Sequence, residues 1–288
     1  MLGSNKKAIR IAILGPEGTF SQDAAEKYHK NRLQNATLEL LFKKSIFRAF
    51  KSVEDDEADL GIVPVENQLE GSIGATLDKL YESELIILGE VSLHIHHFFA
   101  AKDRSADIKS IISNSVAIAQ CSGFLNKSYP DADITNAAST AEAMRIIAEN
   151  KMPGFAAIGS ESAVKRYGLE ILAENIEDNN VNITNFIVIG KKSFEHGKNT
   201  LGKFKTSISV KPSVDKPGLL CDILYALKKQ SINLTKIQSR PSGEKLGNYI
   251  FFIDLIGHAQ DENVALALNN IKDIAEVKIF GSYHYNGD

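Results

Sequence analysis

The sequence has only two cysteines among its 288 residues, and no apolar stretch is long enough to cross a membrane. Cys121 and Cys221 are too few for a disulfide framework, which favours reduced thiols in a cytoplasmic protein. The N-terminal segment is basic and then apolar, but its apolar part is short. We therefore expect neither a signal peptide nor a membrane anchor.

A surplus of basic residues is also absent. The 33 lysines and arginines nearly balance the 36 acidic residues, for a formal net charge of −3. Nucleic-acid binding needs a concentrated basic face, so no nucleic-acid partner is expected. The hydrophobic content of 43% is enough for one large or two modest globular cores.

The first two thirds of the chain repeat one pattern: an apolar strand, a polar or glycine-containing loop, and a helix. Residues 9–14, 60–63 and 154–158 are strands of this kind. Strands that alternate with helices predict a parallel sheet covered on both faces. Ligands bind such sheets beyond the carboxyl ends of the strands, where the polar segments of this sequence lie.

The last third follows a different order, with four strands around two helices. We expect the strands at residues 206–210, 234–239, 249–256 and 277–280. The order β-α-β-β-α-β predicts a ferredoxin-like unit, whose exposed sheet edge favours pairing with a second copy. The polar segment 191–203 between the two patterns is predicted to be a linker.

Several short polar segments suggest binding sites, although each also fits an ordinary turn. Residues 15–21 (GPEGTFS) join a strand to a helix, where free backbone N–H groups suit a carboxylate or phosphate. Their glycine spacing does not match a dinucleotide fingerprint. The segments 64–67 and 182–186, taken alone, are better explained as a capped turn and a strand entry.

Three histidines lie close together at residues 94–97. His94 and His96 are two positions apart, which places them on one face of a predicted strand. No acidic residue or cysteine accompanies them at ligand spacing, and two ligands make a poor metal site. The sequence therefore predicts no metal centre.

In this order and spacing, the segments resemble the prephenate dehydratase family over nearly the full chain. The matching stretches are GPEGTFS (15–21), ADLGIVPVEN with EGS (58–72), residues 113–121, STAEA (139–143), AAIGSESAVKRYGLEIL (156–172) and NIT-F (182–186). The C-terminal part resembles an ACT domain through KPGLL (216–220), INLTKIQSRPSG (232–243) and NYIFFIDLIGH (248–258).

The resemblance implies an α/β fold with two domains. A two-lobed catalytic domain, similar to type II periplasmic binding proteins, is expected over residues 1–190, with the second lobe at about 92–180. A ferredoxin-like βαββαβ ACT regulatory domain is expected over residues 204–288, after the linker at 191–203. The substrate would lie between the two lobes.

The resemblance also implies a hydro-lyase, a carbon–oxygen lyase that converts prephenate to phenylpyruvate in phenylalanine biosynthesis. L-Phenylalanine would act as the feedback effector through the ACT domain of a homodimer or homotetramer. Aromatisation of the ring drives the family's reaction, so neither a redox cofactor nor a metal is expected. Cytoplasmic localisation fits this role.

Segment matching assigns a role to individual residues. The family's catalytic positions fall on Thr184, Ser113, Gln120 and Asn67. Substrate-binding positions fall on Gly18, Thr19, Phe20, Ser21, Glu66, Asn185 and Phe186. Phenylalanine-binding positions fall on Gly218, Leu219, Leu220, Asn233, Ser239, Arg240 and Pro241.

The predicted mechanism assigns each group a task. Thr184 would donate a hydrogen bond to the departing hydroxyl group, in a network with Ser113 and Gln120. Asn67 and the N–H groups of residues 18–21 would hold the substrate carboxylates.

The sequence departs from the family pattern at several of these segments. Asn185 replaces the arginine of the family's Thr-Arg-Phe motif, Gln68 replaces a serine or threonine, and Asn114 replaces a histidine. The lost arginine is expected to weaken carboxylate binding by about 1.5–3 kcal/mol. Lys102 and Arg104 are candidates for a substitute cation.

These departures leave other functions open. The chain could prefer arogenate, or decarboxylate prephenate without loss of water, or sense an amino acid without catalysis. Product identification separates the four possibilities.

Overall fold

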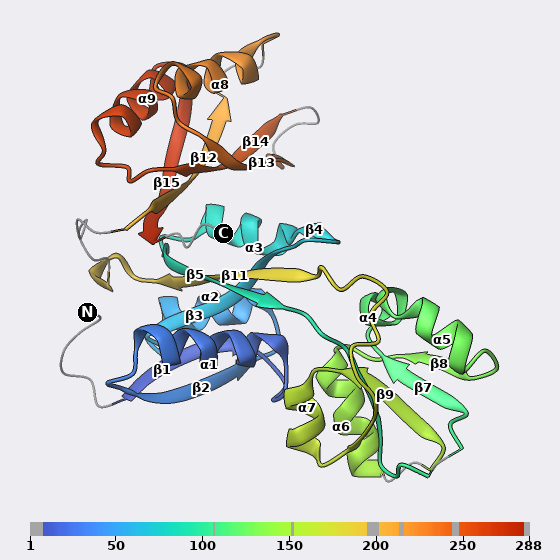
Figure 1. Cartoon of the computed structure of the whole chain (residues 1–288). Helices are drawn as coiled ribbons and strands as arrows, with labels where there is room; N and C mark the ends of the chain where they lie inside the picture. Colours follow the sequence, from blue (N-terminus) through green and yellow to red (C-terminus); the bar gives the residue numbers. More distant parts are fainter. Residues whose placement is uncertain are drawn as a thin grey trace.

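The computed structural model describes residues 8–105, 107–150, 153–194, 202–212, 216–243 and 248–284. These residues form three bodies, each built on its own β-sheet (Figure 1). Within the described ranges, no helix combines the length and the apolar character that a bilayer span requires.

The first body, or first lobe, contains a sheet of order β2-β1-β3-β11-β5, with β4 paired to β3. Its strands are β1 (Ala8–Leu14), β2 (Thr37–Lys43), β3 (Leu60–Asn67), β4 (Gly71–Ser72), β5 (Ile86–His94) and β11 (Ile183–Gly190). Helix α1 (Phe20–Arg32) packs on one face, and helices α2 (Ile46–Glu54) and α3 (Gly74–Glu82) pack on the other.

Strand β11 explains why the sheet is mixed rather than all-parallel as predicted. It runs antiparallel to both of its neighbours, β3 and β5. The chain leaves the first lobe at the end of β5 and returns at that same end, so the returning strand must run the opposite way. Its residues supply two cores in alternation, since successive side chains on a strand point to opposite faces.

The second lobe contains a five-stranded sheet of order β10-β6-β9-β7-β8. Its strands are β6 (Phe98–Ala101), β7 (Ser110–Ser113), β8 (Asp133–Asn136), β9 (Phe155–Gly159) and β10 (Glu170–Ala173). Its helices are α4 (Ser115–Gln120), α5 (Ser122–Ser128), α6 (Thr140–Asn150) and α7 (Glu161–Tyr167). Strands β7, β8 and β9 are parallel, whereas β6 and β10 run antiparallel to their neighbours.

Two crossover segments, residues 95–97 and 174–182, connect the lobes (Figure 1). They lie side by side, since the Ile95 N–H donates to Asn182 O at 2.7 Å and the Ile176 N–H donates to His97 O at 3.0 Å. The residues between the lobes are therefore held by a double connection.

The third body has the predicted β-α-β-β-α-β order and a sheet of order β13-β14-β12-β15. Its elements are β12 (Phe204–Pro212), α8 (Leu219–Lys229), β13 (Leu234–Pro241), β14 (Tyr249–Ile256), α9 (Glu262–Lys272) and β15 (Ala275–His284). Before it, residues 192–194 form a 3₁₀ turn inside the predicted linker, and residues 195–201 lie outside the described part of the chain.

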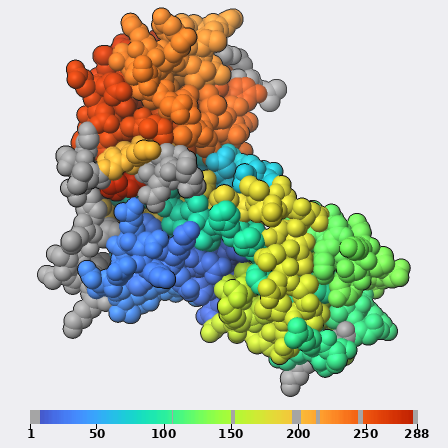
Figure 2. Space-filling view, in the orientation of Figure 1, coloured from blue at the N-terminus to red at the C-terminus, as the bar shows by residue number. Residues whose placement is uncertain are grey.

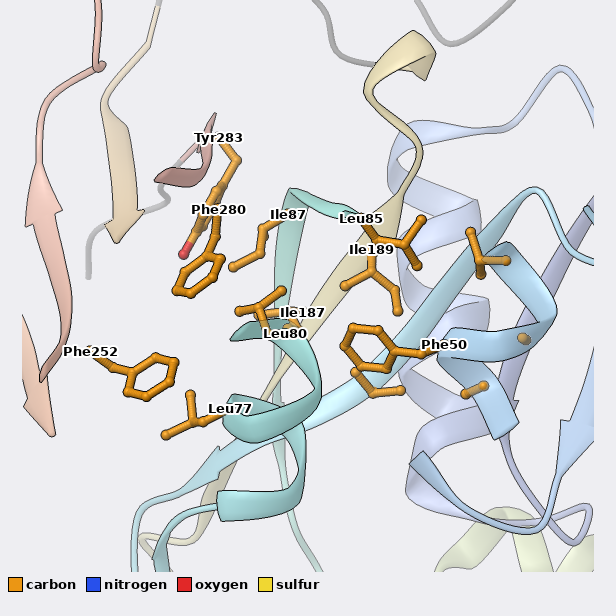
Figure 3. Packing of buried hydrophobic residues seen from close by; sticks show 14 of the residues in the cluster. Phe50, Leu77, Leu80, Leu85, Ile87, Ile187, Ile189, Phe252, Phe280 and Tyr283 are labelled. Carbon is orange, nitrogen blue, oxygen red and sulfur yellow. The ribbon is translucent and has the colours of Figure 1, made fainter. Parts of the chain in front are cut away.

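One face of the third sheet packs directly on the first lobe. Phe252 and Phe280 stack at a ring separation of 5.8 Å and share a core with Leu77, Leu80 and Ile87 of the first lobe (Figure 3). In Figure 2 the orange and red surface of this body meets the first lobe and stands apart from the green second lobe. Its helices α8 and α9 cover the opposite face of the sheet, over a separate core.

Candidate active site

Asn67 and Thr184 begin a hydrogen-bonded group where the two lobes meet. They occupy paired positions on β3 and β11. Asn67 Nδ2 donates to Thr184 Oγ1 and to Asn182 Oδ1, both at 2.8 Å. Asn67 Oδ1 accepts the backbone N–H groups of residues 69 and 70 at 2.9 and 3.0 Å. Because backbone N–H groups only donate, they fix which end of the Asn67 amide is the oxygen.

The orientation of the Asn67 amide determines that of Asn182, which is 1% exposed and links Asn67 to the second lobe. Its oxygen faces Asn67, so its NH₂ group donates to Gln120 Oε1 at 3.1 Å. Gln120 is the last residue of α4. Its own NH₂ group is thereby turned toward Glu70, and Gln120 Nε2 lies 3.5 Å from Glu70 Oε1. The structure therefore links three of the four predicted catalytic residues: Asn67, Thr184 and Gln120.

The hydroxyl group of Thr184 is arranged to donate. Its oxygen already accepts the hydrogen bond from Asn67, and the residue is 9% exposed. A hydroxyl group has one proton, so that proton is available to an additional acceptor. The site thus offers two neutral donors, the Thr184 O–H and the Gln120 NH₂.

Ser113, the fourth predicted catalytic residue, does not belong to this group. It is fully buried, and its hydroxyl donates to Ile158 O at 2.8 Å. This bond joins the neighbouring strands β7 and β9. The geometry gives Ser113 a structural position at the end of β7, just ahead of the helix that carries Gln120.

The segment Gly15–Ser21 lies against helix α7 of the second lobe. Ser160 Oγ donates to Gly18 O at 2.7 Å, and Tyr167 Oη donates to Glu17 O at 2.9 Å. The Gly18 N–H was predicted to bind a substrate carboxylate. It donates instead to Gln22 Oε1 at 2.8 Å and is therefore already paired. The N–H groups at the first turn of α1, from Phe20 and Ser21, have no intrahelical acceptor and keep that capacity.

Gly18 and Thr19 fix the path of this segment. Gly18 has φ +84°, and a Cβ atom there would lie 2.8 Å from Ala163 Cα. Thr19 Oγ1 donates back to Leu14 O at 2.8 Å. The absence of a side chain at residue 18 is therefore required for the two lobes to touch.

Asp23 on α1 lies near the same contact between the lobes. The pKa of Asp23 is raised to about 6, mainly by burial and to a smaller extent by the charges of Glu26 and Glu161. A hydrogen bond with Ser162 acts in the opposite direction and lowers the pKa. The first turn of α1 therefore carries a carboxyl group that changes charge near neutral pH.

Glu66 and Asn185 were predicted to bind substrate, but they face away from Thr184. They are paired across β3 and β11 and lie on the opposite face of the sheet from Thr184. A β-bulge at residue 65 of β3 lies next to this pair. Glu66 lies 3.3 Å from Lys236 Nζ, and Asn185 Oδ1 accepts from Ser92 Oγ at 2.7 Å. Both line a cavity of about 30 Å³ between the first lobe and the third sheet.

This placement corrects the prediction about the missing arginine. The side chain of residue 185 points toward the third sheet. The replacement of arginine by asparagine there removes a positive charge from that face and not from the surroundings of Thr184. Phe186, also predicted to bind substrate, is 2% exposed within the core under α1. Lys102 and Arg104 are exposed beyond the end of β6 that is farther from the crossover.

The predicted effector residues are divided between two elements of the third body. Gly218 caps α8 with φ +86°, while Leu219 is buried in the core under the helices. Ser239, Arg240 and Pro241 end strand β13. The remaining two residues are Leu220, on α8, and Asn233, whose backbone oxygen accepts from the Ile256 N–H at 2.9 Å.

Arg240 contacts the first lobe rather than its own domain. Its Nε donates to Asp78 Oδ1 at 3.0 Å, and its Nη2 donates to the other carboxylate oxygen. The guanidinium group also lies over Gly74 at the start of α3. Arg240 therefore joins the third body to α3.

The histidine segment does not gather into a metal centre. His94 and His96 stack at 6.3 Å, and His96 Nδ1 lies 2.7 Å from Glu177 Oε1. His97 is turned inward, with its Nε2 3.0 Å from Gln120 Oε1. Throughout the described ranges, no three potential metal ligands cluster together.

Three members of the hydrogen-bonded group were not predicted as site residues: Glu70, His97 and Asn182. Asn182 lies in a segment noted for its amides, so a polar residue directly before a site strand was an available signal. His97 lies in the histidine segment and Glu70 in the EGS stretch, but the sequence did not connect them with the site, because their partner Gln120 is distant in sequence.

Comparisons with known proteins cover both parts of the chain. The family model described as prephenate dehydratase matches residues 11–194, and that of the ACT domain matches residues 208–273. The chain is 39% identical over 284 residues to the bifunctional chorismate mutase/prephenate dehydratase of Aquifex aeolicus, covering 97% of this chain and 75% of that protein. It is 41% identical over 242 residues to the prephenate dehydratase of Methanocaldococcus jannaschii, covering 83% and 85%.

A solved structure agrees with these matches. The prephenate dehydratase of Arthrobacter aurescens in complex with L-Phe superposes with a TM-score of 0.86 at 34% identity, covering 96% of this chain and 90% of that chain. The likeness extends over all three bodies, which confirms the predicted fold of two α/β lobes followed by a ferredoxin-like domain.

Proposed function

Since the chain belongs to the prephenate dehydratase family and carries a C-terminal ACT domain, we propose that it converts prephenate to phenylpyruvate. Water and carbon dioxide leave in this reaction, so the enzyme is a hydro-lyase. The C–C bond between the ring and its carboxylate breaks, and its electrons enter the ring. The C–O bond to the hydroxyl group breaks as well. The gain of aromaticity supplies the driving force.

The proposed site lies where Asn67, Thr184 and Gln120 meet between the lobes. The observation that carries this assignment is the Asn67–Thr184 hydrogen bond, which leaves the Thr184 proton free to donate. A departing hydroxyl group needs a proton or a strong hydrogen bond as charge develops on its oxygen. Thr184 supplies that donor, and the Gln120 NH₂ group and the first turn of α1 orient the substrate oxygens.

The proposed domain division follows the three sheets. The catalytic unit spans residues 1–190, with its second lobe at about 92–180, and the ACT domain spans residues 204–288. Residues 191–203 join them. Cys121 and Cys221 are both free thiols, which supports a reducing, cytoplasmic location.

Regulation by L-phenylalanine is the second part of the proposal. The solved relative from Arthrobacter aurescens was determined in complex with L-Phe. In this chain the effector would bind between two ACT domains of a homodimer or homotetramer, near Gly218 and Ser239. Strand β13 lies at an edge of its sheet and exposes 45% of Ile237, which suits a contact between copies.

Ultraviolet detection of phenylpyruvate formed from prephenate tests the function directly. Turnover that falls on addition of L-phenylalanine supports both parts of the proposal. Phenylalanine formed from arogenate would indicate the related specificity, and a non-aromatic acid would indicate decarboxylation alone. A protein that binds L-phenylalanine but consumes neither substrate is a sensor, and this result would refute the catalytic proposal.

A further inference from the structure

His97 is a second hydrogen-bond partner of the Gln120 side-chain oxygen. Its Nε2 lies 3.0 Å from Gln120 Oε1, and the residue is 2% exposed. The residue belongs to the first crossover segment, and its ring meets the Phe20 ring edge-on at 5.9 Å. One imidazole therefore contacts the first lobe through Phe20 and the second lobe through Gln120.

The direction of the hydrogen bonds fixes the protonation of this ring. Asn182 donates to Gln120 Oε1, so the carbonyl end of Gln120 is the end that faces His97. A carbonyl oxygen only accepts, which means that His97 Nε2 carries the proton. Burial lowers the pKa of His97, which favours a neutral ring with Nδ1 unprotonated.

The other ring nitrogen argues against a purely structural role. Nδ1 is buried and has no hydrogen-bond partner among the described residues. An unpaired buried acceptor lowers stability, and an apolar side chain of similar volume would avoid that cost. A histidine is thus unfavourable for packing here but well suited to donate to Gln120.

We propose that His97, as the neutral imidazole protonated at Nε2, is a positioning residue that holds the Gln120 amide with its NH₂ group turned toward bound substrate. This inference rests on the proposed dehydratase function of the same site. Asn182 and His97 together give the Gln120 oxygen two donors, so rotation of the amide would break both bonds. The backbone N–H groups of residues 69 and 70 determine this direction through Asn67 and Asn182.

Two substitutions separate donation from packing in the full-length protein. His97→Gln keeps an N–H donor near the position of Nε2, whereas His97→Leu fills the space without one. His94→Leu is the matched control, since His94 is an exposed histidine of the same segment. We expect His97→Leu to lower kcat/KM for prephenate about tenfold or more, His97→Gln to recover most of it, and His94→Leu to have no effect.

A double variant tests whether His97 acts through Gln120. If it does, His97→Leu combined with Gln120→Leu is no slower than Gln120→Leu alone. Losses that multiply would show that His97 acts elsewhere and would overturn the proposal.

The tautomer of His97 gives a test that needs no turnover. Two-bond proton–nitrogen NMR spectra of the parent protein should show the Nε2–H form, assigned by its absence in His97→Gln. An Nδ1–H form of His97 would overturn the proposal. A parent protein that shows the Nε2–H form but does not consume prephenate would refute the proposed function and leave the positioning geometry supported.

Discussion

Asn67 and Thr184 face each other across β3 and β11, with Asn67 Nδ2 2.8 Å from Thr184 Oγ1. The residues next to them, Glu66 and Asn185, are also paired but face the ACT domain. The same two strands therefore present the proposed catalytic groups on one face and the regulatory contact on the other. A shift of these strands would move the residues on both faces of the sheet.

Removing the Thr184 hydroxyl should abolish most turnover. Thr184→Val keeps the volume but loses the donor, so we expect kcat to fall about 100-fold or more, whereas Thr184→Ser should retain most activity. Phenylpyruvate formation measures kcat, and thermal unfolding checks that Thr184→Val folds. Turnover of the valine variant within a few-fold of the parent would show that Thr184 is not the donor.

A side chain at residue 18 should separate the lobes. In Gly18→Ala the new Cβ would lie 2.8 Å from Ala163 Cα, so we expect KM for prephenate to rise with a loss of stability of about 1–3 kcal/mol. Gly168→Ala is the matched control, because Gly168 also has positive φ but open space around it. Equal effects on KM in both variants would contradict a role for the contact between the lobes.

Asp23 should make stability depend on pH in a defined direction. Its pKa rises from 3.8 to about 6 on folding, so the folded state binds the proton more tightly and the unfolding free energy falls as pH rises from about 4 to 6. Asp23→Asn should therefore be more stable than the parent by about 1–3 kcal/mol at pH 7.5 and equal to it near pH 4. Denaturant unfolding at both pH values measures this, with Asp131→Asn as an exposed control. The same difference at both pH values would refute titration of Asp23 as the cause.

Arg240 and Asp78 should influence regulation as a pair. Because the pair is partly exposed, Arg240→Ala and Asp78→Ala should each cost less than about 1 kcal/mol of stability. If the pair couples the domains, both should raise the L-phenylalanine concentration for half-inhibition about fivefold or more, and the exchange Arg240→Asp with Asp78→Arg should restore it in part. An effect of Arg240→Ala without one from Asp78→Ala would instead make Arg240 an effector ligand.

The sequence pattern was sufficient for the main elements of the fold. Apolar strands with polar ends predicted β1, β3, β9 and β11, and the order of the last six elements predicted the ACT domain. The antiparallel course of β11 was not predictable from local pattern, because it follows from where the chain returns after the second lobe. The helical segment around Cys121 is divided into two short helices, α4 and α5.

The site was predicted in part, and the differences from the prediction have separate physical origins. Thr184 and Asn185 are consecutive on a strand, so strand alternation alone excludes that both face one substrate. The inward turn of His97 could not be derived from sequence, since its partner Gln120 lies 23 residues away at the end of α4. Ser113 lies outside the hydrogen-bonded group because its hydroxyl donates to the backbone carbonyl of Ile158.

The core shared by the ACT domain and the first lobe has a consequence for unfolding. Phe252 and Phe280 complete the same cluster as Leu77, Leu80 and Ile87, whereas the second lobe encloses clusters of its own. The ACT domain and the first lobe should thus lose structure in a single cooperative step, although the second lobe separates β1 to β5 of the first lobe from the ACT domain in sequence. The second lobe, inserted in the chain between β5 and β11 of the first lobe, is free to open first and close last, so native-state hydrogen exchange should divide the molecule by shared apolar contact rather than by chain order.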